Sequence, residues 1–144
     1  MMKINDVINA KPSHEVVTIG PDATVRELIA LLAEHNVGAL VVSEDGERVT
    51  GIVSERDVVR RLHADEAVLD TVVRDIMTAD VRTCAAEDGL TDLMQTMTQH
   101  RIRHVPVVAD GRLTGIISIG DVVKSRIGEL EFERDQLDSY VHQV

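Results

Sequence analysis

An internal repeat constrains the fold of this chain more than any other feature of its sequence. The segment Gly51–Val59 (GIVSERDVV) matches the segment Gly115–Val123 (GIISIGDVV) at six of nine positions. The two segments start 64 residues apart, so the chain carries one motif twice. A motif repeated at this distance predicts two copies of one supersecondary unit, each too small to bury a sufficient core alone.

The repeat extends upstream of this motif. Val37–Val42 in the first copy matches Ile102–Val107 in the second, at a distance of 65 residues. Apolar residues at the helical spacing i, i+3, i+4, i+7 also occur once in each copy. They are Val25, Leu28, Ile29 and Leu32 in the first copy, and Leu90, Leu93, Met94 and Met97 in the second. These matches place the copies at residues 5–65 and 74–125, joined by a linker at 66–73.

Each copy predicts the same order of elements: strand, helix, strand, a turn at Asp-Gly, strand and helix. Thr24 and Glu27 form a capping box that predicts the start of the first long helix, and Asp88 is expected to cap its counterpart. Two such units, packed about a pseudo-twofold axis, give an α+β fold with two equivalent clefts between the copies. The expected strands are Val16–Ile19, Ala39–Val42, Val49–Val53, Val81–Cys84, Val105–Val108 and Leu113–Ile117.

The C-terminal stretch Val122–Val141 predicts a long helix that extends beyond the second copy, in the region 126–144. Its apolar residues follow a heptad-like spacing, with Arg134 at the one missing position. They are Val123, Ile127, Leu130, Leu137 and Val141. At about 1.5 Å per residue, this helix would be about 30 Å long. Two interpretations of the stripe remain open: the helix folds back over its own core, or it forms a homodimer contact.

The charge of the chain excludes several classes of partner. Its 144 residues include 15 Lys and Arg against 25 Asp and Glu, for a net charge of -10. Nucleic acids and anionic membranes are bound mainly by neutralising phosphates with Lys and Arg, so neither is an expected partner. No apolar run approaches the roughly 20 residues of a membrane span. The first residues also lack the apolar core of a signal peptide, so we expect a cytoplasmic location.

Cysteine and aromatic residues are nearly absent. Cys84 is the only cysteine, so no internal disulfide can form, which is typical of a reducing compartment. Phe132 and Tyr140 are the only aromatic residues, and both lie near the C-terminus. A flat ligand held by the two repeats would therefore be gripped by aliphatic side chains and backbone rather than by aromatic stacking.

Motifs of the common enzyme classes are missing. The sequence contains no Gly-x-x-x-x-Gly-Lys-Ser/Thr phosphate loop, no Gly-x-Gly-x-x-Gly turn before a helix and no Gly-x-Ser-x-Gly elbow. His100 and His104 have a metal-ligand spacing, but His104 falls where a strand is expected to begin and no third ligand lies nearby. An enzyme using Asp57 and His104 would lack an activated nucleophile and a paired acid and base. We therefore expect neither catalysis nor a metal site.

The repeated Gly-h-h-Ser-x-x-Asp motif, in which h is apolar, has two compatible interpretations. Each serine is expected to cap the helix that follows, and the helix dipole favours the aspartate at the third helical position. The glycine leaves the backbone bare, and a carboxylate at a helix start suits a pair of ribose hydroxyls. The residues concerned are Gly51, Ser54 and Asp57 in the first copy, and Gly115, Ser118 and Asp121 in the second.

Basic residues gather in the second copy, at Arg101, Arg103 and His104. The matching segment of the first copy, Val37–Ala39, has no basic residue, and only the first copy has an arginine, Arg56, before its motif aspartate. In an acidic chain, such a cluster at the mouth of one cleft predicts an anion site. Solvated surface arginines with acidic neighbours are the alternative.

Together these motifs resemble a pair of cystathionine β-synthase (CBS) domains, also called a Bateman module. The resemblance covers Asp6–Lys124 and is to stand-alone bacterial proteins with two CBS domains. It rests on the two repeated motifs, on the Asp-Ile-Met-Thr sequence that opens the second copy and on its Arg-His-Val-Pro-Val-Val segment. It implies β-α-β-β-α units, an intramolecular pair and often a homodimer. It also implies regulatory binding of AMP, ATP, NAD or S-adenosylmethionine, with no required cofactor.

The resemblance further implies one ligand site in each cleft. Carried onto this chain, the first nucleotide site uses Ser54, Arg56, Asp57, Thr78, Val81, Ile102, Arg103, His104 and Pro106. Its aspartate would accept hydrogen bonds from ribose hydroxyls, its basic residues would hold phosphate, and Val81, Ile102 and Pro106 would sandwich adenine. The second, weaker site uses His14, Val16, Val37, Gly38, Ser118 and Asp121. It lacks the arginines, so the first site is expected to bind AMP or ADP more tightly.

The function expected from the sequence is a non-enzymatic sensor that binds AMP, ADP, ATP or NAD in the cleft between the two copies. Occupancy of the cleft would be passed to a homodimer interface or to a regulated protein of unknown identity, since we find no effector domain in the sequence. The alternative is a structural or interaction module without a physiological nucleotide, in which the C-terminal helix carries the function.

Overall fold

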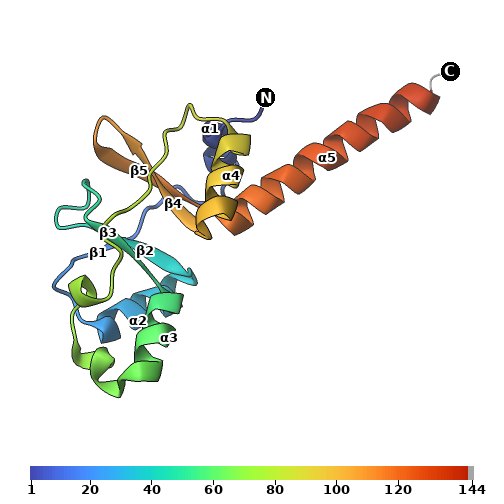
Figure 1. Ribbon diagram of the computed structural model, residues 1–144. Helices are drawn as coiled ribbons and strands as arrows, with labels where there is room; N and C mark the ends of the chain where they lie inside the picture. The colour runs from blue at the N-terminus through green and yellow to red at the C-terminus, as the bar shows by residue number, and fades with distance from the viewer. Residues whose placement is uncertain (143–144) are drawn as a thin grey trace.

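Two small sheets, one from each repeat, form the centre of the fold (Figure 1). In the computed structural model, which describes residues 1–142, β1 (Thr18–Ile19) runs parallel to β2 (Ala39–Val42). Strand β2 pairs antiparallel with β3 (Gly51–Ser54). The second sheet is the antiparallel pair of β4 (His104–Ala109) and β5 (Arg112–Ser118). With the helices beside these sheets, the arrangement confirms the predicted α+β fold.

The helices divide between the two sheets. Apolar side chains of α2 and α3 pack with the first sheet, and those of α1, α4 and the start of α5 pack with the second. Thr24 is the N-cap of α2, and its Oγ1 accepts a hydrogen bond from the Glu27 N–H (3.2 Å), as expected. The bounds are α1 Ile4–Asn9, α2 Val25–His35, α3 Glu55–Ala64, α4 Leu90–His100 and α5 Ile119–His142, with 3-10 helices η1 Glu66–Asp70 and η2 Val73–Asp75.

The cap predicted for the helix of the second repeat is wrong by one residue. Gly89, not Asp88, is the N-cap of α4, and no side chain caps this helix. Asp88 Oδ2 instead accepts a hydrogen bond from the Ala85 N–H (2.9 Å), which closes the turn before the helix. The Asp88 carboxylate therefore bonds to the backbone before α4 and does not cap the helix.

The strand predicted at Val81–Cys84 is reduced to one residue. Cys84 pairs in parallel with Val107 of β4, which matches the pairing of Ile19 with Val42 in the first repeat. The chain just before this segment is held on the other sheet, because Thr78 pairs with Ile52 of β3. Only the end of the predicted strand then lies against β4.

The repeated motifs form matching capping boxes, as predicted. The Asp57 N–H donates to Ser54 Oγ (3.3 Å), and the Ser54 N–H donates to Asp57 Oδ2 (2.8 Å). In the second repeat, the Asp121 N–H donates to Ser118 Oγ (3.1 Å), and the Ser118 N–H donates to Asp121 Oδ2 (2.9 Å). Each box satisfies backbone donors that the helix start would otherwise leave unpaired.

Each repeat contributes its leading segment to the core of the other. Ile4 and Val7 of α1 are buried among the residues of α4, β4 and β5. Val68 of η1 and Val73 of η2, from the region expected as a linker, are buried with α2, α3 and the first sheet. The exchange joins the two repeats through buried apolar surface, which opposes their separation.

The motif glycines are not bare, contrary to the sequence expectation. Gly51 and Gly115 are both buried. A Cβ atom at Gly51 would lie 2.7 Å from Met77 Sδ and 2.9 Å from the Thr78 carbonyl oxygen. Gly51 therefore allows residues 77–78 to cross closely over β3, and its lack of a side chain is explained by chain packing rather than by a ligand.

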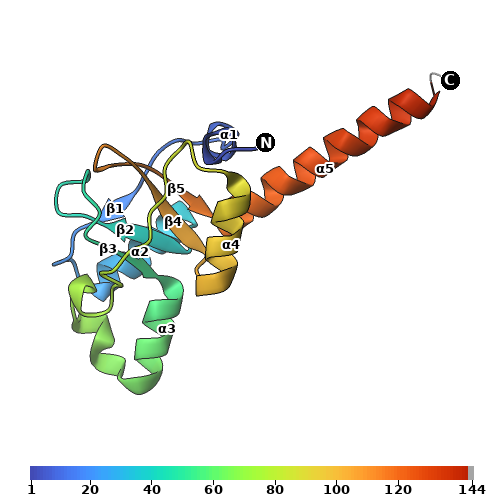
Figure 2. The same ribbon diagram turned by 45° about the horizontal axis from the view of Figure 1, so that its top comes forward.

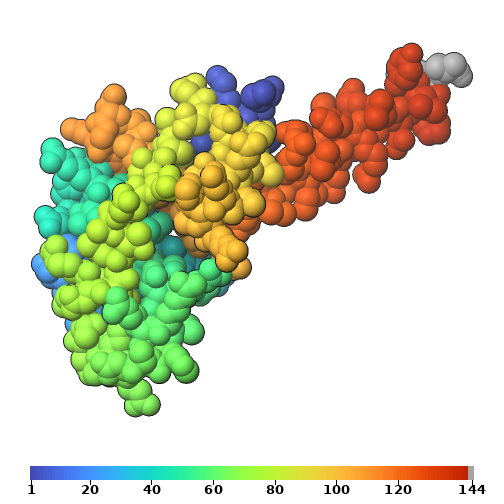
Figure 3. Space-filling model, viewed as in Figure 1, coloured from blue at the N-terminus to red at the C-terminus, as the bar shows by residue number. Residues whose placement is uncertain are grey.

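Helix α5 projects away from the two repeats, as all three views show (Figures 1, 2 and 3). Its 24 residues correspond to about 36 Å of helix, and they continue the last helix of the second repeat without a break. The apolar stripe is about half exposed, from 49% at Val123 and Leu130 to 66% at Leu137. The helix thus does not fold back over its own core. Residues 143–144 of the predicted extension lie outside the described residues.

Within residues 1–142, no helix is both long enough and apolar enough to cross a membrane.

Candidate functional site

A cavity of about 440 Å³ opens between the two repeats. The first repeat contributes the start of β2, part of β3 and the first turns of α3, and the second contributes Thr78 and the connection from α4 to β4. The lining residues are Gly38, Ala39, Ile52, Ser54, Glu55, Arg56, Asp57, Arg60, Thr78, His100, Arg101, Ile102, Arg103 and His104. Residues distant in the sequence thus meet at one hollow, as expected for a cleft between two copies.

Seven of the nine residues predicted for the first site line this cavity, and two do not. Pro106 is buried in the middle of β4, where it pairs with Ile116 and its carbonyl oxygen accepts the Cys84 N–H (3.0 Å). Val81 is half-buried between the Thr78 bridge and the Cys84 bridge. The apolar part of the wall is formed instead by Ala39, Ile52 and Ile102.

Asp57 presents one free carboxylate oxygen at the floor of the cavity. Its Oδ2 accepts hydrogen bonds from the Ser54 N–H (2.8 Å) and the Ser54 hydroxyl (3.1 Å). Within residues 1–142, its Oδ1 makes no hydrogen bond and its carboxylate makes no ion pair. The capping box therefore fixes the side chain while leaving an acceptor for a ligand.

Four arginines surround the cavity with only two carboxylates, those of Glu55 and Asp57. None of the arginines makes an ion pair in the part of the chain that the structure describes. Unpaired guanidinium groups on a chain of net charge -10 concentrate positive potential at this one place. The four are Arg56 and Arg60 from α3, and Arg101 and Arg103 from the α4–β4 connection.

Two of the basic lining residues, Arg60 and His100, were not predicted for a binding site, and Arg101 was predicted only as part of the anion cluster. Arg60 lies one helical turn after Arg56 on α3, so the i, i+4 spacing was a usable signal. His100 was noted in the sequence only for its metal-ligand spacing with His104, and Arg101 belongs to the predicted basic cluster, but the resemblance assigned neither to the nucleotide site. The cavity is consequently more basic than the sequence analysis predicts.

Arg101 has an unfavourable backbone conformation for its residue type. It is the C-cap of α4, with φ of 53° in the left-handed region. The equivalent C-cap of α2 is Asn36, with φ of 51°, and asparagine tolerates this region better than arginine. The Arg101 side chain lies on the cavity wall, and a binding role for it there would explain why an arginine is kept at a strained position.

His104 lies where the two repeats meet. A Cβ atom added at Gly38 would be 3.4 Å from Glu55 Oε1 and 3.6 Å from His104 Nε2, so these groups crowd around this glycine. Burial lowers the pKa of His104, despite the opposing effects of the Asp121 and Glu55 carboxylates. The side chain is therefore mainly neutral near pH 7, and the arginines supply most of the positive charge of the cavity.

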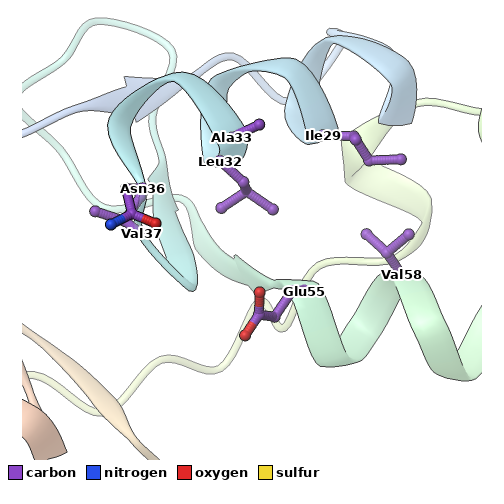
Figure 4. Close-up of a pocket in the computed structure, with 7 residues that line it drawn as sticks. All are labelled: Ile29, Leu32, Ala33, Asn36, Val37, Glu55 and Val58. Carbon is purple, nitrogen blue, oxygen red and sulfur yellow. The ribbon is translucent and has the colours of Figure 1, made fainter.

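The six residues predicted for the second site do not share one cavity. Gly38 lines the cavity described above. Val37 lines a separate hollow between α2 and α3 (Figure 4), and Asp121 faces a hollow between α1 and α5. His14, Val16 and Ser118 line none of these three hollows. The two predicted clefts are therefore unequal in shape as well as in charge.

Neither thiol chemistry nor metal binding is supported by the geometry. Burial, followed by the negative charge of Asp88, raises the pKa of Cys84 to about 12, so this thiol stays protonated. Within residues 1–142, no cluster of three or more His, Cys, Asp or Glu side chains is arranged to hold a metal ion. The sequence-based interpretation of Cys84 as an inert thiol agrees with this environment.

The comparisons with known proteins agree with the symmetry of the fold. The family model described as "CBS domain" matches residues 4–64 and again residues 73–128. The CBS-domain containing protein ATU1752 from Agrobacterium tumefaciens is 43% identical, with a TM-score of 0.82 over 87% of this chain and 99% of that chain. The structure of protein MJ0100, solved with 5′-methylthioadenosine and S-adenosyl-L-methionine, is 22% identical, with a TM-score of 0.76 over 85% of this chain and 98% of that chain.

This chain is also similar in sequence to a eukaryotic protein. CBS domain-containing protein CBSX3, mitochondrial, from Arabidopsis thaliana is 39% identical over 125 residues, which are 83% of this chain. The match spans only 61% of the length of that relative. The two family matches cover most of the sequence, one on each repeat. The chain belongs to the CBS domain family and consists of two CBS domains in tandem.

Proposed function

We propose that this chain is a non-enzymatic sensor that binds an adenine nucleotide in the cavity between its two CBS domains. One observation carries the proposal: the cavity brings a carboxylate oxygen of Asp57 together with four arginines, none of whose side chains has a hydrogen-bond or ion-pair partner among residues 1–142. A carboxylate accepts hydrogen bonds from ribose hydroxyls, and arginines bind phosphate oxygens in a bidentate manner. The adenosyl compounds in the MJ0100 structure support a ligand of this class.

The charge of the cavity favours phosphate over other 5′ substituents of adenosine. The arginines attract the phosphates of AMP, ADP, ATP or NAD, and the attraction grows with the number of negative charges. They repel the sulfonium cation of S-adenosyl-L-methionine, a ligand in the MJ0100 structure. We therefore propose that adenosine polyphosphates bind best, with adenine against Ala39, Ile52 and Ile102.

Thermal melting with a panel of ligands tests this proposal. A ligand that binds only the folded chain stabilises it by about 2.7 kcal/mol at 100 times its Kd. We expect the melting temperature to rise most with ATP and ADP, less with AMP and NAD, and least with S-adenosyl-L-methionine. Inorganic phosphate at the same concentration is the control for general anion effects. An equal change in melting temperature with all the nucleotides and with inorganic phosphate would contradict the proposal and favour a structural module.

A variant at Arg101 separates the role of its charge from its role in the fold. Arg101→Asn copies the residue of the first repeat at the left-handed C-cap, so we expect the unliganded chain to melt at the same or a higher temperature. The rise caused by ATP should shrink by more than half, while the rise caused by neutral adenosine should not change. Arg61→Ala is the matched control, because Arg61 lies on α3 but not on the cavity wall.

We also propose that α5 forms the contact of a homodimer. The stripe Val123, Ile127, Leu130, Leu137 and Val141 is exposed on a helix that stands away from the body of the chain. An exposed apolar stripe with heptad-like spacing, interrupted only at Arg134, is costly in water and is typical of an interface between helices. Dimerisation through α5 would give the sensor a second surface to which occupancy of the cavity can be coupled.

Solution mass measurements test the dimer. We expect the wild-type chain to have about twice its monomer mass of 15.8 kDa in light scattering, and the double variant Leu130→Glu/Leu137→Glu to be monomeric. Ser139→Glu, which adds a charge on the opposite side of the same helix, should leave the dimer intact. A double variant with the mass of the wild-type chain would exclude α5 as the contact.

A bound nucleotide would act by linking the two domains. Its ribose would lie on Asp57 of the first domain, and its phosphates would lie near Arg101 and Arg103 of the second. Such a bridge stabilises one relative orientation of the domains, and that difference in affinity is what a sensor can transmit. The regulated partner would distinguish this orientation from others.

A further inference from the structure

The carboxylate of Asp121 is occupied by a side chain of its own protein. Lys11 Nζ lies 3.1 Å from Asp121 Oδ2 and donates a hydrogen bond to the Ile116 carbonyl oxygen (3.0 Å). Both side chains are about three-quarters buried, with exposed fractions of 26% for Lys11 and 23% for Asp121. Asp57, the counterpart of Asp121 in the first repeat, has no such partner within residues 1–142.

The symmetry of the repeats shows which group Lys11 replaces. In the first cleft, the Thr78 N–H donates to the Ile52 carbonyl oxygen (2.9 Å), and Thr78 lines the cavity. Ile116 is the counterpart of Ile52 in the repeat, and its carbonyl oxygen is bonded by the Lys11 ammonium instead. A long cationic side chain therefore stands where the first cleft has a backbone N–H beside open space.

The length of the leading segment explains this difference. Seven residues separate Ile8 from Val16, whereas three separate the equivalent Met77 from Val81. The longer segment of the first repeat carries Lys11 past α1 and over β5. Burial raises the pKa of Asp121, but the Ser118 N–H and the Lys11 ammonium outweigh it, so the pKa is lowered overall. The ion pair thus holds Asp121 in its charged form.

We infer that Lys11 closes the second cleft by neutralising the Asp121 carboxylate and by binding the Ile116 carbonyl oxygen beside it, so that each chain binds one nucleotide rather than two. The inference rests on the proposed function, because it assigns to Asp121 the ribose contact proposed for Asp57. The ammonium contacts Oδ2, the oxygen that also accepts the Ser118 N–H, so it weakens the other oxygen as an acceptor for ribose hydroxyls by neutralising the charge of the carboxylate. It is also tethered at high effective concentration. Lys11 is then the residue that makes two similar domains bind ligand unequally.

Site-resolved NMR with adenosine tests the inference. Adenosine is the probe because it carries the ribose hydroxyls without a phosphate that would respond to the arginines. In the wild-type chain, we expect saturable amide shifts at residues 54–57 and none at 118–121. In Lys11→Met, saturable shifts should appear at both places. Lys124→Met is the matched control, since Lys124 faces the same α1–α5 hollow but forms no ion pair within residues 1–142.

A melting cycle without any ligand tests the ion pair itself. We expect Lys11→Met to lower the melting temperature by a few degrees, and to lower it less when Asp121→Asn is already present, where only the Ile116 hydrogen bond remains to be lost. The inference would be overturned by saturable shifts at 118–121 in the wild-type chain, or by their absence in folded Lys11→Met. It would also be overturned if Lys11→Met lowered the melting temperature equally with and without Asp121→Asn. Absence of shifts at 54–57 in every chain would instead overturn the proposed function and, with it, the claim of one nucleotide per chain.

Discussion

Replacing Asp57 by Asn is expected to weaken ATP binding by about 100-fold in calorimetry, because each hydrogen bond to a charged group is worth roughly 1.5–3 kcal/mol. The variant should fold normally, since the asparagine side-chain oxygen can still accept the Ser54 N–H bond that closes the capping box. The loss would therefore report the carboxylate on the cavity floor rather than the helix start.

Asp121→Asn is the matched control for this prediction. The substitution is chemically identical and falls at the equivalent position of the second capping box. Because the Asp121 carboxylate is paired with Lys11, we expect ATP affinity to change by less than about threefold. Similar losses of ATP affinity in the two variants would show that the aspartates act only through folding. An unchanged ATP affinity in Asp57→Asn would show that this carboxylate does not bind the ribose.

Replacing Gly51 by Ala is expected to destabilise the chain by about 2 kcal/mol, the usual cost of forcing atoms into a packed site. A Cβ atom there would approach the Thr78 carbonyl oxygen to 2.9 Å, and backbone cannot move aside as easily as a side chain. The melting temperature should fall by about 7 °C. Because Thr78 lines the cavity, ATP affinity should also fall.

The repeat supplies the control for Gly51. At Gly115 the nearest atoms to an added Cβ are Ile8 Cδ1 at 3.5 Å and Val107 Cβ at 3.9 Å, which are ordinary contacts. Gly115→Ala should therefore change stability by less than about 1 kcal/mol. Equal destabilisation by the two substitutions in thermal melts would contradict the explanation of Gly51 by the crossing of residues 77–78.

The features that the sequence predicted well depend on residues close together in the chain. Each capping box is formed by a serine and an aspartate three residues apart, and the repeat supplied each signal twice. The strands β2, β4 and β5 were also predicted, because β-branched residues flank a turn at Asp-Gly. Such local signals were sufficient for the fold class, whereas the full residue set of the first site came from the family resemblance.

The features that the sequence did not predict depend on how distant segments cross. The contact between Lys11 and Asp121 joins residues 110 positions apart, and nothing near either residue indicates it. The burial of Gly51 under Met77 and Thr78 has the same origin, because it requires the leading segment of one repeat to lie on the sheet of the other. Pro106 was assigned to the cavity from the resemblance alone, whereas it is buried in the middle of β4, where it pairs with Ile116 and does not line the cavity.

A crystal structure of the chain grown with ATP is the most direct test of the central claim. We expect one ATP per chain in the cavity of about 440 Å³, with its ribose hydroxyls on Asp57 Oδ1 and its phosphates beside Arg101 and Arg103. We also expect the Lys11 ion pair with Asp121 to be retained. An empty cavity at saturating ATP, or a nucleotide bound on Asp121 instead, would contradict the central claim.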